Sequence, residues 1–180
     1  MTLLPLVTAL NNLQALVTPT EPYVFDDHDP KETEKIAKDM IETMYKFNGV
    51  GLSGNQCGVP WAVFVMRGEK QDFACFNPQI VQPGVEEIKM DEACLSVPGM
   101  VMKINRPKHV KIRFTDIHKD RDTFTYTGLT ARIFQHELDH LEGKLFFDGC
   151  SRISLERAIN QAKRRGFDYT GIGFMKYARH

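Results

Sequence analysis

Residues 135–143 read QHELDHLEG and contain residue types that bind metals and move protons. His136 and His140 are four positions apart, so on a helix their side chains share one face, with Cβ atoms about 5 to 6 Å apart, and can bind one ion. Glu137 lies about 100° around the helix from His136, where it can reach a water on that ion without being a ligand. The pattern predicts two metal ligands beside a carboxylate base; an accidental match on a solvated helix face is the competing interpretation.

A catalytic metal site needs a third protein ligand and an open position. The candidates are Cys94, Glu92, Asp91, His109, His118 or a more distant acid. Residues 91–99, DEACLSVPG, place an acid, a thiol and a turn together and resemble neither a strand nor a helix, so we expect a loop. A Cys94 thiolate with two imidazoles would form a sulfur and nitrogen set suited to zinc or a similar divalent metal. From spacing alone, a buried core cysteine is an equally good interpretation of Cys94.

Helices and strands that would position these residues can be predicted from local signals. Thr130 as N-cap and Gly143 as the residue after the last turn bound the helix that carries the motif. Asp29, Pro30 and Glu32 are typical of a helix start, and the apolar spacing that follows continues to residues 48–49. A further helix is predicted near residues 154–165.

The strand signals favour an α+β fold rather than a parallel sheet. Strands are predicted at 61–66, 73–76, 110–114 and 123–127, and the charged stretch between the last two indicates a hairpin. The glycine-rich residues 49–60 surround the polar Gln56. Because strands precede the motif helix without βαβ alternation, we expect antiparallel β-sheets surrounding a central helix, with additional N- and C-terminal helices.

The composition indicates one globular domain, residues 1–180. With 42% hydrophobic and 26% charged residues, disordered, fibrous and membrane-spanning classes are excluded. Basic and acidic residues both number 23, so no overall field favours DNA or an anionic membrane. Residues 3–17 are apolar, but no basic residue precedes Lys31, which argues against a secretory signal or transit peptide. We expect a cytoplasmic protein, or one in the equivalent compartment of a host cell or organelle.

Three stretches, taken together, resemble the motifs of peptide deformylases. They are GVGLSGNQ at 49–56, EACLS at 92–96 and QHELDH at 135–140, and their order and separations also match. The FNP at 76–78 and the run GLTARIFQHELDHLEGKLF at 128–146 agree with the same family. The resemblance covers roughly residues 30–150, and three motifs in order are far more specific than any one alone.

This resemblance implies a metal-dependent hydrolase that removes the formyl group from the N-formyl-methionine of new polypeptides and releases formate. The implied ligands of one divalent ion are Cys94, His136 and His140, with Fe²⁺ as the native ion and Zn²⁺, Ni²⁺ or Co²⁺ as replacements. Glu137 would carry the proton from water to the leaving amine. The side-chain amide of Gln56 and the backbone N–H of Leu95 would stabilise the oxyanion. The implied methionine pocket comprises Val50, Gly51, Ile133 and the ring of His136.

Three charged residues and Gln56 each have two interpretations. Glu92, Asp139 and Arg106 could orient the ligands or form ordinary ion pairs, and Gln56 could simply satisfy a turn. The chain departs from the usual family pattern at several positions: Ala93 in place of glycine, Ser53 and Gly54 in place of alanines, and no arginine at 99–102. We expect the small replacements to preserve the geometry, whereas the missing arginine puts peptide affinity in doubt.

Two other functions remain possible from the sequence. A related hydrolase acting on another N-acyl substrate is one, and a non-catalytic module with a structural metal is the other, although a structural site needs neither a base nor an oxyanion donor. A basic C-terminal segment could contact ribosomal RNA, but a solvated helix face is the favoured interpretation. Its basic residues are Lys163, Arg164, Arg165, Lys176 and Arg179.

Overall fold

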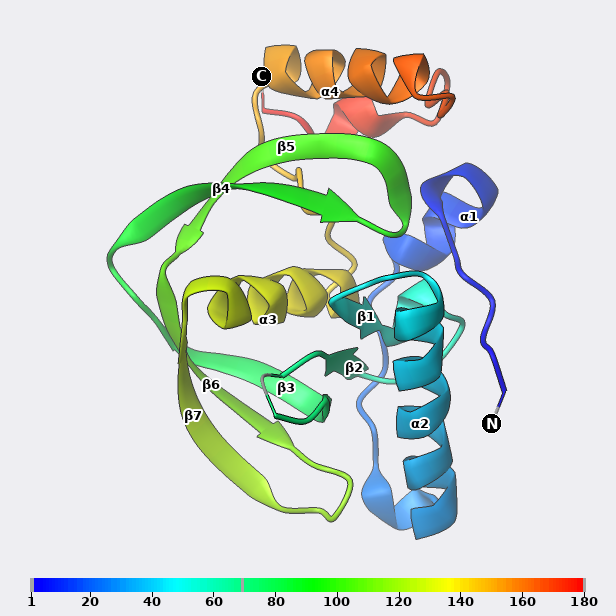
Figure 1. Ribbon diagram of the computed structural model, residues 1–180, viewed down its shortest axis with the longest axis vertical. Helices are drawn as coiled ribbons and strands as arrows, with labels where there is room; N and C mark the ends of the chain where they lie inside the picture. The colour runs from blue at the N-terminus through cyan, green and yellow to red at the C-terminus, as the bar shows by residue number, and fades with distance from the viewer. Residues whose placement is uncertain (1, 69, 180) are drawn as a thin grey trace.

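The computed structural model describes residues 2–68 and 70–179 (Figure 1). Its helices are α1 (Ala9–Leu16), α2 (Pro30–Lys46), α3 (Gly128–Leu141) and α4 (Arg152–Arg164), with short 3-10 helices η1 (Phe25–Asp27), η2 (Gly54–Gln56) and η3 (Phe174–Tyr177). Its strands are β1 (Gly51–Ser53), β2 (Val63–Met66), β3 (Phe73–Pro83), β4 (Glu87–Cys94), β5 (Val97–Pro107), β6 (His109–Thr115) and β7 (Arg121–Thr127). Among these residues, no helix combines the length and apolar character needed to cross a bilayer.

Two antiparallel sheets enclose α3. The larger sheet has the strand order β1-β2-β3-β6-β7, and β4 and β5 form a separate two-stranded ribbon. The chain leaves the larger sheet after β3, makes the β4–β5 ribbon, and returns with β6. Figure 1 shows α3 in the middle of the molecule, with the ribbon on one side and the larger sheet on the other. The predicted α+β fold around a central helix is therefore confirmed.

The apolar face of α3 determines how the helix is rotated. Ala131, Phe134 and Leu138 are buried against the larger sheet, where Phe134 meets Phe64 edge to face with ring centroids 5.0 Å apart. Burying one phenylalanine contributes roughly 2 to 3 kcal/mol, so this contact holds the rotation firmly. Residues two positions from Phe134 lie across the helix, and His136 is therefore directed away from the larger sheet.

Several predicted elements are confirmed. Helix α2 begins at Pro30, and the Asp29 carboxylate accepts the Lys31 N–H at 2.7 Å, as expected of an N-cap. The β6–β7 hairpin is present with its register running from His109 opposite Thr127. The expected C-terminal helix is α4, which packs on β5 (Figure 1). The expected N-terminal helix is α1, the first helix of the chain.

Two local predictions were wrong. Residues 91–99 are not a loop, because their two ends belong to β4 and β5, and Glu92 pairs with Met102 in the ribbon. Most side chains of β4 are exposed, so the strand lacks the alternating apolar pattern that reveals strands in a sequence. Helix α3 begins at Gly128 rather than after Thr130, because Thr127 already has the extended conformation of the preceding residue.

Candidate active site

Helix α3 and the end of β4 together bring three metal-binding side chains to one point. His136 and His140 come from α3, and Cys94 is the last residue of β4. The donor atoms of the three side chains all lie within 4.8 Å of one another, and all three residues are buried. Cys94 Sγ and His140 Nε2 are 3.1 Å apart. The antiparallel ribbon thus supplies the third donor that the helix alone cannot provide.

The chemistry of this cluster fits a divalent metal ion. Nδ1 of His140 is buried and has no hydrogen-bond partner within residues 2–68 and 70–179. Burial lowers the pKa of His140 well below its usual value, so the ring is neutral and keeps a lone pair for a ligand bond. Two imidazole nitrogens and one thiolate sulfur leave a coordination position open, as a catalytic site requires.

A charged relay behind His136 fixes the orientation of its ring. We use this name for Glu92, Arg106, Arg132 and Asp139. Glu92 Oε2 lies 3.0 Å from His136 Nδ1, so the other ring nitrogen is left for the metal. Arg106 donates to both oxygens of Glu92 at 2.6 and 3.0 Å and to Asp139 at 2.6 Å, while Arg132 donates to Glu92 at 2.5 Å.

The Glu92 carboxylate is ionised over nearly the whole accessible pH range. Burial alone would raise the pKa of Glu92, but hydrogen bonds from His136 and Arg106 outweigh burial and lower that pKa to about 2. Such a buried anion surrounded by donors makes the relay rigid. Glu92, Asp139 and Arg106 therefore contact each other and a predicted ligand, as one of the two sequence interpretations anticipated.

Glu137 faces the opposite wall, formed by β1 and η2. The hydroxyl of Ser53 lies 2.5 Å from Glu137 Oε2. Gly51 is so close that a Cβ built on it would clash with the Glu137 carboxylate, so a larger residue there would require that side chain to move. Burial raises the pKa of Glu137 above its usual value, although His136 and the Ser53 hydroxyl oppose the shift. A buried carboxylate with a raised pKa is suited to exchange protons near neutral pH.

Gln56 is held in place from three sides. Its Oε1 accepts the Ser53 N–H at 2.8 Å, and its Nε2 lies 3.1 Å from Ser96 Oγ and 3.5 Å from Cys94 Sγ. Ser96 Oγ donates to the carbonyl of Val7 at 2.7 Å, and the Val7 N–H donates to the backbone carbonyl of Gln56 at 2.7 Å. Gln56, Ser96 and Val7 thus form a closed ring of hydrogen bonds, which directs the amide nitrogen toward the cluster.

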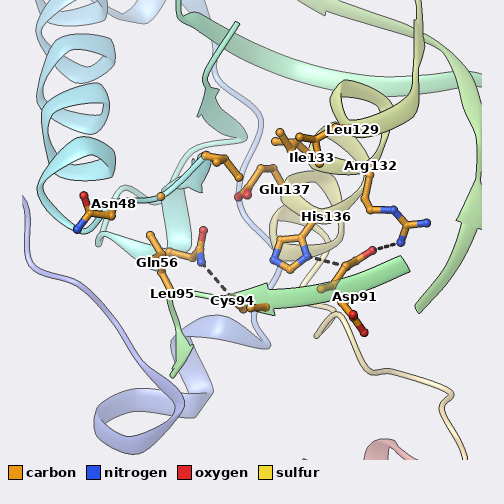
Figure 2. A pocket seen from close by; sticks show the side chains of 15 residues that line it. Asn48, Gln56, Asp91, Cys94, Leu95, Leu129, Arg132, Ile133, His136 and Glu137 are labelled. Carbon is orange, nitrogen blue, oxygen red and sulfur yellow. Dashed lines mark hydrogen bonds and ion pairs between the residues drawn. The ribbon is translucent and has the colours of Figure 1, made fainter. Parts of the chain in front are cut away.

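A cavity of about 340 Å³ opens beside this constellation (Figure 2). Figure 2 shows Gln56, Cys94, His136 and Glu137 directed toward a common space. The predicted pocket and oxyanion residues also line the cavity: Val50, Gly51, Leu95 and Ile133. His140 lies behind the lining, consistent with its nearly complete burial.

Other sequence candidates are not in the cluster. Asp91 is exposed, and Glu92 contacts His136 rather than adding a fourth donor. His109 is on β6, and His118 lies beside a second cavity at the β6–β7 turn. Within the described part of the chain, the metal-binding cluster contains neither of these two histidines.

Sequence reasoning missed three polar residues of the site. Arg132 was noted only within a helix, Ser96 only within a motif, and Ser53 only as a small replacement for alanine. All three are buried, and each makes a hydrogen bond to a predicted site residue. One signal in the sequence could have identified Arg132. It lies four residues before His136 and therefore on the same helix face, and a charged residue on a face that is expected to be buried needs a partner there.

Comparisons with known proteins agree with this geometry. The sequence model described as "Polypeptide deformylase" matches residues 5–156. The chain belongs to the polypeptide deformylase family. A peptide deformylase of Phenylobacterium zucineum is 39% identical over 138 residues, covering 74% of this chain and 82% of that protein. One from Rickettsia akari is 34% identical over 175 residues, covering 91% and 97%.

Solved structures of peptide deformylases have the same fold as this chain. A peptide deformylase from Legionella pneumophila has a TM-score of 0.81 at 28% identity, with 92% of this chain and 96% of that chain covered. Polypeptide deformylases are metalloenzymes that hydrolyse the formyl amide of nascent peptides. The predicted family and enzyme class are therefore confirmed, and the Cys94, His136 and His140 cluster can hold the metal.

Proposed function

We propose that this chain removes the N-formyl group from formyl-methionine peptides, with one divalent metal ion held by Cys94, His136 and His140. The observation that carries the proposal is the position of this cluster in the wall of a cavity that also contains Glu137 and Gln56. A structural metal site would be closed by four protein ligands and would need no neighbouring base. The open cavity therefore favours catalysis over a structural role.

A divalent ion held by Cys94, His136 and His140 would supply Lewis-acid chemistry, lowering the pKa of water and polarising the formyl carbonyl. Glu137 takes the proton from the attacking water and delivers it to the leaving amine, because burial keeps its affinity for protons high. The amide of Gln56 and the backbone N–H of Leu95 donate to the formyl oxygen as negative charge develops there. Hydrogen bonds from Ser53 and to Ser96 hold the Gln56 amide before the substrate arrives.

The cavity supports methionine as the first residue of the substrate. Val50 and Ile133 contribute apolar side chains to its wall, and Gly51 leaves room beside Glu137. An unbranched, flexible thioether is a good occupant for a small apolar pocket of this kind. Ala93, which replaces the usual glycine, is exposed in the same lining and adds only one methyl group.

The remaining parts of the proposal concern the ion and the setting. Fe²⁺ is proposed as the native ion, with Zn²⁺, Ni²⁺ or Co²⁺ as substitutes, because a thiolate and two imidazoles accept all of them. We propose that residues 1–180 act as one domain in the cytoplasm or the equivalent compartment of a host cell or organelle. We also propose that the basic C-terminal segment contacts ribosomal RNA, which salt-dependent co-sedimentation with ribosomes would test.

The decisive experiment measures metal content and formate release together, under anaerobic conditions because a thiolate-bound ferrous site is prone to oxidation. The wild type should release formate from a formyl-methionine peptide and leave an acetyl-methionine peptide intact. Glu137→Gln should keep its metal and lose at least about a hundredfold in rate, because the amide cannot exchange protons. Cys94→Ala should lose both metal and activity.

Each outcome separates one part of the proposal from the others. Full activity in Glu137→Gln would refute the proposed base, and full metal occupancy in Cys94→Ala would refute the ligand set. Preferential cleavage of the acetylated peptide would instead indicate a hydrolase for another N-acyl substrate. A metal-loaded wild type that releases no acid from either peptide would refute the catalytic function.

A further inference from the structure

Among residues 2–68 and 70–179, Ser53 alone contacts both Glu137 and Gln56 through hydrogen bonds. It ends β1, immediately before η2, and its exposed fraction is 0%. Its backbone N–H donates to Gln56 Oε1 at 2.8 Å. Its side-chain oxygen lies 2.5 Å from Glu137 Oε2 and 3.0 Å from the backbone oxygen of Glu137. One residue thus touches the proposed base and the proposed oxyanion donor.

The hydroxyl of Ser53 donates its hydrogen bond to the carboxylate of Glu137. A serine hydroxyl has one proton to donate, and the two possible acceptors differ in distance and charge. The backbone oxygen is the more distant one and, within α3, already faces the N–H of the residue four positions later. A short bond from a hydroxyl to a carboxylate is the stronger type.

The two oxygens of Glu137 therefore have different surroundings. Oε2 is bound by Ser53, whereas Oε1 lies against Gly51, which lines the cavity. The carboxylate cannot rotate freely, because the hydroxyl holds one oxygen and the close backbone of Gly51 restricts the other. Restricting a reacting group in this way contributes to rate by limiting unproductive geometries.

Building on the proposed function, we propose that Ser53 is a positioning residue that presents Oε1 of Glu137 to the reacting water. Its hydroxyl fixes the carboxylate, and its backbone N–H independently aligns Gln56. A chain with alanine at position 53 would lack the hydroxyl that holds the carboxylate. Because only the hydroxyl is removed, Ser53→Ala tests the first function and leaves in place the backbone N–H that binds the Gln56 side chain.

The test compares Ser53→Ala and Ser53→Cys with a matched control, Thr33→Val. Thr33 is a buried hydroxyl that bonds to Tyr23, and neither residue lines the active-site cavity. All variants are prepared with Co²⁺, and kcat, KM, thermal stability and the thiolate absorption band of Co²⁺ are measured. That band reports the Cys94 ligand and does not depend on turnover.

We expect Ser53→Ala to lower kcat by roughly tenfold with KM within about twofold, because one hydrogen bond to a charged group is lost. Ser53→Cys, a weaker donor of similar size, should fall between alanine and wild type. Thr33→Val should lose thermal stability but keep kcat. The Co²⁺ band should be unchanged in every variant.

An unchanged kcat in Ser53→Ala would overturn the proposal while leaving the proposed function intact. A loss of the Co²⁺ band in Ser53→Ala, or an equal drop of kcat in Thr33→Val, would show a general structural role and would also overturn it. Failure of the proposed function is a different result, namely a wild type that binds Co²⁺ and releases no formate.

Discussion

The proposed site residues on the two sides of α3 are held by different physical means. On the ribbon side, the charged relay of Glu92, Arg106, Arg132 and Asp139 holds the proposed metal ligand His136 through ion pairs. On the β1–η2 side, neutral groups hold the proposed base Glu137, through one hydroxyl and the close backbone of a glycine.

The difference follows from what each side chain must do. A ligand must stay in one position, and buried charge pairs with several hydrogen bonds provide that rigidity. A base must gain and lose a proton, and a cation bound directly to Glu137 would lower its pKa too far for that task. The nearest fixed guanidinium groups accordingly bind Glu92 rather than Glu137.

The largest effect should come from breaking the charged wall with Glu92→Gln. This change leaves Arg106 and Arg132 buried without their anion, and we expect a loss of about 3 kcal/mol in the free energy of unfolding. Metal affinity should fall by about 10- to 100-fold, because the ring of His136 loses its negatively charged acceptor. Denaturant unfolding and metal competition measure the two losses. Glu87→Gln, at an exposed position of the same strand, is the control and should change neither the free energy of unfolding nor the metal affinity. Equal losses in both variants would contradict the role given to the charged relay.

Breaking the neutral wall with Gly51→Ala should affect the rate and spare the metal. The new Cβ would clash with Glu137 Oε1, so the carboxylate must move. A displacement of this kind costs about a hundredfold in kcat. Steady-state kinetics with metal analysis would check this. Loss of the metal with an unchanged kcat per bound ion would show that Gly51 supports the metal ligands rather than Glu137.

A smaller effect should distinguish the walls by the sign of their pH dependence. The pKa of Glu92 is lowered from 4.5 to about 2, so its stabilisation is complete above pH 4.5 and is lost as the pH falls toward 2. The pKa of Glu137 is raised by burial, so its ionised form destabilises the fold above its unfolded pKa, and acid relieves this cost.

Unfolding of metal-free variants between pH 7 and pH 3 measures these two contributions. The stability deficit of Glu92→Gln should shrink toward low pH. Glu137→Gln should be slightly more stable than the wild type at pH 7 and lose that advantage in acid. If both variants were less stable than the wild type at pH 7, or both more stable, the proposed difference between the two walls would be contradicted.

The sequence was informative where the interactions are local. His136, Glu137 and His140 could be placed together because one helical turn relates them. Cys94 could not be separated from the other candidate ligands by spacing, because its place beside His140 depends on how β4 pairs with β5. Only the resemblance to a family selected it.

Ser53 and Ser96 show why the rest of the site was missed. Ser53 contacts Glu137, which lies 84 residues away in the chain, and Ser96 contacts Gln56, which lies 40 residues away. A serine carries no periodic signal that would reveal such contacts. The β4 strand was missed for a related reason, since a mostly exposed strand in a two-stranded ribbon has no apolar alternation. Long-range pairing, rather than local preference, completes the site.

The hydrogen-bond ring of Val7, Ser96 and Gln56 has a consequence for synthesis and folding. It ties residue 7 to residues 56 and 96, while α3 must add His140 before the metal cluster is complete. Contacts of such long sequence separation form late, because closing large loops costs entropy before any contact compensates for it. An emerging chain of this protein can therefore act on other new polypeptides only after the ribosome has made the segment through α3 and released it from the exit tunnel.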